Sequence, residues 1–128
     1  PTRRSSDLIF CLMNRTAKTM HIYIVRMDHP DGTGWNTFVR EHVIYLKGLI
    51  EQGKLLASGP LKNTPLRAGF LIFRAETRDE VQSMISADPF AREGLIAKLE
   101  IHEWDPLFGL LDRYSSHNTI SELQDLIG

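Results

Sequence analysis

The sequence predicts a ferredoxin-like α+β fold, with the element order β-α-β-β-α-β and a four-stranded antiparallel sheet. The prediction depends on a long apolar stripe at helical spacing, a shorter stripe behind a capping motif, and short runs rich in β-branched and aromatic residues around them. Two split β-α-β units with right-handed crossovers place both helices on one face of such a sheet.

The length and composition fit one globular domain. The chain has 128 residues, of which 42% are hydrophobic and 24% are charged, so we expect a real core. The formal net charge is −1, with acidic and basic residues interspersed, which argues against a nucleic-acid-binding protein. Cys11 is the single cysteine and no Cys/His cluster has zinc spacing, so we expect a reducing, cytoplasmic location and no metal site.

Residues 1–19 are interpreted as a leader outside the domain. Their apolar run, from Leu8 to Met13, is too short for a secretory signal or a membrane span, so no membrane association is expected. Residues 1–8 resemble an in-frame translation of a sequencing adapter, so we expect the biological start at Met13 or, preferably, at Met20. Without residues 1–19 the chain loses four basic residues and one acidic residue, which takes its formal net charge from −1 to −4.

The first half of the domain predicts a strand and then a long helix. Residues 21–27 are rich in β-branched and aromatic side chains, and the turn-forming residues 28–32 follow them. Apolar side chains then recur at steps of three and four, and Gly53 suits the end of the helix. The stripe consists of Trp35, Phe38, Val39, His42, Val43, Leu46, Leu49 and Ile50.

The second half predicts two strands, a helix and a last strand. Residues 54–58 suit a short strand closed by Gly59-Pro60, residues 61–67 a loop, and residues 69–75 a buried strand. Thr77 and Glu80 form a capping box ahead of a short helical stripe, and Pro89 suits the start of a further turn. Residues 97–104 alternate as a final strand.

One face of this sheet is expected to be apolar and open. Tyr23, Val25, Phe70 and Ile72, with their neighbours, supply more apolar surface than one layer of helices covers. Such a face usually marks an interface, so we expect an isologous homodimer. Beyond a domain at residues 20–105, the extension at residues 106–128 either covers the dimer edge or frays.

The candidate chemistry is a pair formed by His42 and Asp88. His42 lies on the apolar stripe of the first helix and Asp88 at the exit of the second, so the two side chains could meet. A buried carboxylate needs a partner, and a paired imidazole can act as a general acid or base. Structural explanations stay open: Asp88 precedes Pro89 and suits a helix N-cap, and His42 could be a structural histidine.

Other candidates are Ser58, Gly59 and Pro60, where the serine hydroxyl could face a substrate pocket at the end of a strand. A serine that caps a turn explains Ser58 equally well. The residues Asp28, His29 and Asp31 could suggest a metal site, but they suit turn chemistry better.

Several motifs, in the same order, resemble the YCII-related (YciI) family over residues 20–105. They are Arg40-x-His42, Tyr45-Leu46, the run from Gly53 to Leu61, and Ala87-Asp88-Pro89-Phe90-x-x-x-Gly94-Leu95 before a strand that ends at Trp104. The resemblance implies a dimeric α/β barrel, in which two ferredoxin-like sheets pack face to face. It also implies a cleft with a His–Asp pair, here His42 and Asp88.

The resemblance also implies a class of reaction. One branch similar to this family eliminates chloride from a chlorinated hydroxyquinol, and related barrels include muconolactone isomerases; both reactions need proton transfer and no cofactor. We therefore expect a cofactor-independent enzyme that isomerises, or eliminates a group from, a small organic molecule. The alternatives are a small-molecule-binding module without turnover and a dimeric accessory or regulatory module. The tail beyond Asp105 departs from shorter family members, so the substrate does not carry over.

Overall fold

The computed structural model describes residues 19–118 and 121–127. The leader predicted at residues 1–19, with its adapter-like start, therefore lies outside the described residues except for Thr19.

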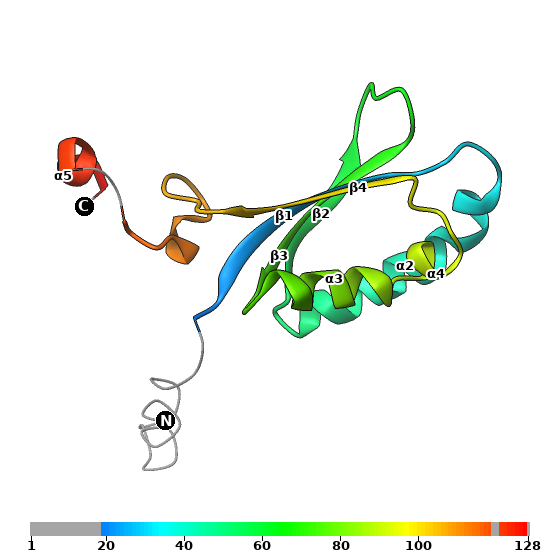
Figure 1. The fold of residues 1–128 in the computed structure, drawn as a ribbon, viewed down its shortest axis with the longest axis horizontal. Helices are drawn as coiled ribbons and strands as arrows, with labels where there is room; N and C mark the ends of the chain where they lie inside the picture. The colour runs from blue at the N-terminus through cyan, green and yellow to red at the C-terminus, as the bar shows by residue number, and fades with distance from the viewer. Residues whose placement is uncertain (1–18, 119–120, 128) are drawn as a thin grey trace, which may run out of the picture.

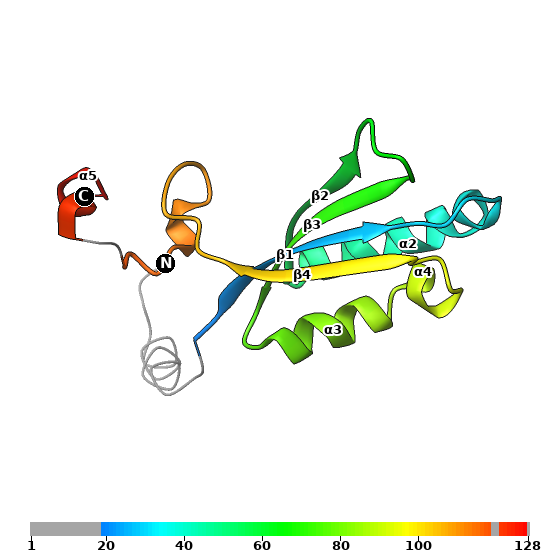
Figure 2. The same ribbon diagram turned by 45° about the horizontal axis from the view of Figure 1, so that its top comes forward.

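The predicted ferredoxin-like fold is confirmed. The four strands pair antiparallel in the order β2-β3-β1-β4, and the helices lie on one side of the sheet (Figures 1 and 2). The strands are β1 His21–Asp28, β2 Leu55–Leu61, β3 Ala68–Ala75 and β4 Lys98–Trp104. The helices of the domain are α2 Gly34–Glu51, α3 Arg78–Ser86 and α4 Pro89–Arg92.

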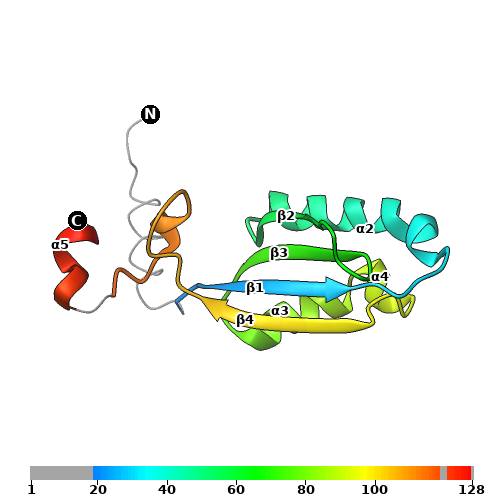
Figure 3. The same cartoon turned by 90° about the horizontal axis from the view of Figure 1, so that it is seen from above.

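The central strand β1 shows how the register divides the sheet into two faces. Val25 pairs with Leu71 on β3 and with Ile101 on β4, and all three are buried beneath the helices. Successive side chains of a strand point to opposite faces, so Ile24, Phe70 and Ile72 face away from the helices. The apolar residues that were expected to exceed one helical layer are thus split, with Tyr23 and Val25 in the core and Phe70 and Ile72 on the open face. Figure 3 views the sheet from this open side, with the helices behind the strands.

Helix boundaries follow the predicted local chemistry. Gly53 has a φ of 73°, a left-handed conformation that glycine adopts without strain, and its N–H bonds the carbonyl of Ile50. Thr77 caps α3, since its hydroxyl accepts the N–H of Glu80 at 3.2 Å. The Glu80 carboxylate accepts the N–H of Glu76 at 2.8 Å, one residue before the position that a capping box predicts.

The predicted end of the second strand is wrong. β2 continues through Gly59-Pro60 to Leu61, where a turn and loop were expected, and Pro60 pairs with Gly69 on β3. β2 is an edge strand, so one side of its backbone has no neighbouring strand to bond, and proline is tolerated there.

The segment after β4 extends from the end of the sheet opposite α4 (Figure 1). It contains short helical turns at Asp112–Tyr114, Ser121–Leu123 and Gln124–Ile127. Asp105 accepts the backbone N–H of Ser116 at 3.0 Å, and the Ser116 hydroxyl also donates to this carboxylate. These hydrogen bonds lower the pKa of Asp105. Leu110, in this segment, is 99% exposed in the single chain.

Among the described residues, no helix has both the length and the apolar character needed to cross a membrane.

Candidate functional site

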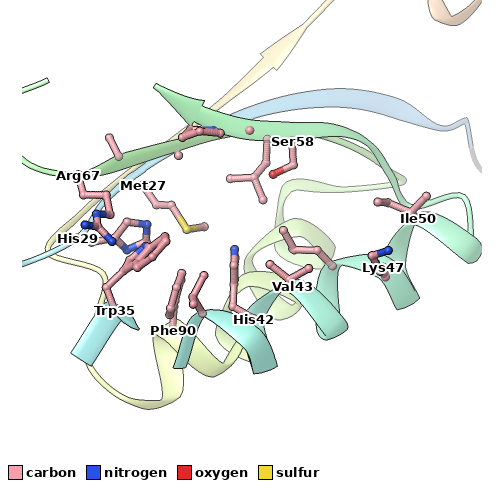
Figure 4. Close-up of a pocket in the computed structure, with 17 residues that line it drawn as sticks. Met27, His29, Trp35, His42, Val43, Lys47, Ile50, Ser58, Arg67 and Phe90 are labelled. Atoms are coloured by element: carbon pink, nitrogen blue, oxygen red, sulfur yellow. The ribbon is translucent and has the colours of Figure 1, made fainter. Parts of the chain in front are cut away.

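A cavity of about 530 Å³ opens between α2 and the sheet. Its volume lies in the range typical of small-molecule sites. Most of its lining is apolar, as such sites usually are, and the polar side chains that face it come from widely separated segments (Figure 4). These polar residues are His29, Trp35, His42, Lys47, Ser58 and Arg67.

The structure brings His42 and Asp88 together at this cavity. Nδ1 of His42 lies 2.9 Å from Oδ1 and 2.8 Å from Oδ2 of Asp88. A carboxylate can only accept, so Nδ1 of His42 is the donor and its proton points at Asp88. In the neutral ring, Nε2 then holds a lone pair, and the ring tip points into the cavity (Figure 4).

Asp88 has the two roles that its sequence position left open. It is the N-cap of α4: its Oδ1 accepts the N–H of Phe90 at 2.8 Å, and Pro89 occupies the first turn. The same carboxylate holds His42. Its side chain is only 2% exposed, and that of His42 is 13% exposed, so little water competes for the pair. The bond is therefore stronger than a surface ion pair of the same length.

The aromatic and phenolic neighbours of the pair fix its position. The ring of His42 stacks on that of Phe90, with centroids 4.1 Å apart. Tyr45, one turn after His42 on α2, donates its hydroxyl to the carbonyl of Met84 on α3 at 2.6 Å. Burial, and secondarily the negative charge of Asp88, raise the pKa of Tyr45, so its hydroxyl keeps its proton near neutral pH and continues to tie α2 to α3.

The predicted residues Ser58, Gly59 and Pro60 also line the cavity. They lie on edge strand β2, where Ser58 pairs with Leu71, so its side chain shares the face of the sheet that the helices cover. Figure 4 shows Ser58 across the cavity from α2. The extension of β2 through Pro60 therefore places these three residues in the wall of the cavity. Their role in substrate binding stays a prediction.

The sequence predicts a turn at His29, but this residue is a buried part of the same cavity, with 4% of its surface exposed. Its Nδ1–H donates to the carbonyl of Leu95 at 2.7 Å, and its ring meets that of Phe90 edge-on at 4.8 Å. Burial lowers the pKa of His29, so its ring is neutral and Nε2 is an acceptor. The sequence offered one hint, a histidine directly after an alternating strand.

Arg67 and Trp35 form a second feature that the sequence did not reveal. The Arg67 guanidinium lies over the indole ring of Trp35, 3.8 Å from the ring centroid, and both line the cavity. The two residues are 32 positions apart, in segments expected to be a loop and a helix start, and no local pattern connects them.

Within the described ranges, no group of three or more His, Cys, Asp or Glu side chains is placed to hold a metal ion. Of the three residues considered for a metal site, His29 donates to the carbonyl of Leu95 and Asp28 accepts Nε–H of Arg26 at 2.9 Å.

The fold and the cavity define this protein as a ferredoxin-like α+β protein with a His–Asp pair beside a pocket of small-molecule size. It belongs to the YCII-related family, because the YCII-related domain matches residues 20–105, more than half of the chain. Comparison with curated proteins gives no match.

Among solved structures, the chain is similar to 5-chloro-2-hydroxyhydroquinone dehydrochlorinase (TftG) from Burkholderia phenoliruptrix AC1100, in complex with 2,5-dihydroxybenzoquinone. The identity is 26% and the TM-score 0.58, over 66% of this chain and 93% of that one. A putative antibiotic biosynthesis monooxygenase from Bacteriodes thetaiotaomicron VPI-5482 gives 18% identity and a TM-score of 0.41, over 70% and 91% of the two chains. A dimeric ferredoxin-like protein from an uncultured marine organism gives 13% identity and a TM-score of 0.42, over 71% of this chain and 90% of that one.

Proposed function

We propose that this protein is an enzyme that isomerises, or eliminates a group from, a small organic molecule by proton transfer. The observation that supports this most directly is the pairing of His42 Nδ1 with buried Asp88, which leaves Nε2 directed into a cavity of about 530 Å³. The similarity to a dehydrochlorinase at 26% identity agrees with an elimination.

In the proposed reaction, Nε2 of His42 takes a proton from the substrate. The electron pair of the broken bond forms a new π bond. In an elimination the leaving group departs with its own bonding pair, and in an isomerisation the proton returns at another carbon. Asp88 orients the ring and stabilises the imidazolium that forms. Both routes are redox-neutral overall, so neither requires an electron donor or acceptor.

Ser58, Gly59 and Pro60 are proposed to contact the substrate from the opposite wall. The hydroxyl of Ser58 can donate to or accept from a substrate oxygen, and the apolar lining excludes water around the ring of the substrate.

The test is a screen of small acidic and phenolic compounds, including chlorinated hydroxyquinols and unsaturated lactones, followed by ultraviolet absorbance. For any compound that is converted, His42→Gln should lower kcat by about 100-fold or more, since this is the usual contribution of a general acid or base. Asp88→Asn should also lower kcat. The matched control is His117→Asn, which replaces an exposed histidine of the tail and should leave the rate unchanged.

The outcomes separate the alternatives. Conversion that His42→Gln leaves intact contradicts the proposed role of His42. Saturable binding with no conversion of any compound favours a binding module. If neither is found, and His42→Gln costs only stability, the pair is structural and the protein is better explained as an accessory subunit.

A further inference from the structure

The charged side chains that line the cavity are positive, although the domain as a whole has a negative net charge. Residues 20–128 carry a formal net charge of −4. Among the described residues that line the cavity, none is Asp or Glu, whereas Lys47 and Arg67 both reach it. The Asp88 carboxylate accepts from His42 Nδ1 and does not line the cavity. A cavity with cationic side chains and no acidic side chain favours an anion.

Arg67 is fixed in position although it is exposed to solvent. Its guanidinium lies 3.8 Å from the centroid of the Trp35 ring, which is contact distance for a stacked pair. Its carbonyl accepts the N–H of His29 at 2.8 Å, so the backbone is fixed just before β3. Stacking uses the face of the guanidinium. The N–H groups at its edge stay free to bind an oxyanion through two parallel hydrogen bonds, in bidentate fashion.

A row of rings connects this cation to the His–Asp pair. Trp35 lies 6.0 Å from Phe90, centroid to centroid, with planes tilted by 32°, and Phe90 stacks on His42 at 4.1 Å. Phe90, in the middle of this row, is only 1% exposed. The row of rings therefore links the Arg67 guanidinium to His42 along the cavity.

Lys47 lies toward the other end of the cavity in Figure 4. It is an exposed residue of α2, and a lysine ammonium is a strongly hydrated charge on a flexible stem, with no planar fork. The stacked Arg67 is therefore the better anchor for a carboxylate.

We infer that Arg67, held against Trp35, binds the anionic group of the substrate, and that the substrate is a small organic anion whose reacting atom lies at His42. The assignment of Arg67 as the anion site rests on the charge and geometry of the cavity. The placement of the reacting atom at His42 rests on the proposed function. His29 Nε2, a neutral acceptor in the same cavity, suits a hydroxyl group on that substrate.

The test uses benzoate and benzamide, which have nearly the same shape and differ in charge. Binding is followed by NMR through the indole N–H of Trp35, distinguished from that of Trp104 with Trp104→Phe. Wild-type protein should bind benzoate about tenfold more tightly than benzamide, the difference expected for a charge-assisted hydrogen bond. Arg67→Gln should bring this ratio close to one, while its spectrum remains that of a folded protein.

Two variants serve as controls. Lys62→Gln removes one positive charge from the same β2–β3 connection without touching the cavity lining, and should keep the preference for benzoate. Lys47→Gln should keep most of it. Equal binding of the two probes by wild-type protein, failure of benzoate to bind, or a preference that disappears in Lys47→Gln and persists in Arg67→Gln would each overturn the inference.

Failure of the proposed function gives a different result. His42→Gln should still prefer benzoate, because the anion site lies at Arg67. A protein that prefers benzoate and converts no compound has the anion site and is not the proposed enzyme. An enzyme that converts neutral and anionic compounds equally, and is unaffected by Arg67→Gln, has the proposed function without this site.

Discussion

The ring of His42 lies nearly flat on the ring of Phe90, with 4.1 Å between centroids and 16° between planes. The backbone N–H of the same Phe90 donates to Asp88 at 2.8 Å. One residue therefore supports both members of the His–Asp pair, one through its side chain and the other through its main chain. The geometry of the pair is consequently part of the packing of the domain, and variants at this position affect both.

The first prediction concerns the proton on His42. The imidazole 15N spectrum of wild-type protein at alkaline pH should show the proton on Nδ1, since Asp88 can only accept. Asp88→Ala removes the acceptor and should produce a mixture of tautomers. His29, whose Nδ1–H donates to the Leu95 carbonyl, is an internal control that should not change. A wild-type His42 that carries its proton on Nε2 would contradict the assignment.

The second prediction separates the two roles of Asp88. Asp88→Ala should lower the free energy of unfolding by about 2 to 4 kcal/mol, because it removes an N-cap and a buried, charge-assisted hydrogen bond. Asp88→Asn keeps an oxygen for the Phe90 N–H and should cost about half as much. Urea denaturation measures both. As a control, Asp79 is an exposed residue in the first turn of α3. Asp79→Ala should lower the free energy of unfolding by only about 0.5 kcal/mol.

The third prediction uses the lowered pKa of His29. The folded protein holds this ring neutral, whereas the unfolded chain protonates it near its ordinary pKa of about 6.5. The unfolded state therefore binds more protons below that pH, and stability falls as the pH drops through this range. His29→Asn keeps a donor for the Leu95 carbonyl and does not titrate. Its free energy of unfolding should decline less between about pH 6.5 and pH 5 than that of wild type; parallel curves would refute this.

The fourth prediction compares two glycines near the end of α2. Gly48 is inside the helix, and a Cβ there would meet no atom within 4 Å, so Gly48→Ala should stabilise the protein by about 0.5 to 1 kcal/mol. A Cβ at Gly53 would also meet no atom within 4 Å. Because Gly53 has a φ of 73°, however, Gly53→Ala should destabilise the protein by about 1 kcal/mol. Thermal or urea unfolding of the pair checks the opposite signs; a loss of stability in both would show that Gly48 has an unseen role.

The fifth prediction concerns assembly, because homodimer formation stays a prediction. The open face of the sheet presents Ile24, Phe70 and Ile72, and a hollow of about 270 Å³ lies between β2 and β3 on it. Sedimentation should show a dimer, and Ile72→Glu should shift it toward monomer by placing a charge in the interface. Ile44→Glu, at a 59% exposed position of α2, is the matched control and should remain dimeric. A monomeric wild type would exclude the predicted barrel.

Much of the fold could be predicted from local patterns. The stripe of α2, the cap at Thr77 and the alternation around Ile101 each depend on residues close in the chain, and the structure confirms them. Gly59-Pro60 misled because its local signal is a turn, and only the place of β2 at the sheet edge makes a strand acceptable there.

The residues of the candidate site also divide into those that local patterns predict and those that depend on contacts between distant segments. His42 and Asp88 were placed together because each lies on the buried side of a helix and both helices share a face. His29 and the Arg67–Trp35 pair were not found, because their positions depend on contacts between segments far apart in the sequence. In the described part of the chain no buried side-chain nitrogen or oxygen lacks a hydrogen-bond partner.

The double use of Asp88 affects how relatives of this chain should be interpreted. A homologue without the proposed chemistry would still need an acceptor for the first turn of α4, so selection for folding alone would retain the aspartate. An aspartate at this position therefore does not identify an active homologue. The histidine of α2 is the more informative marker, because no capping function depends on it.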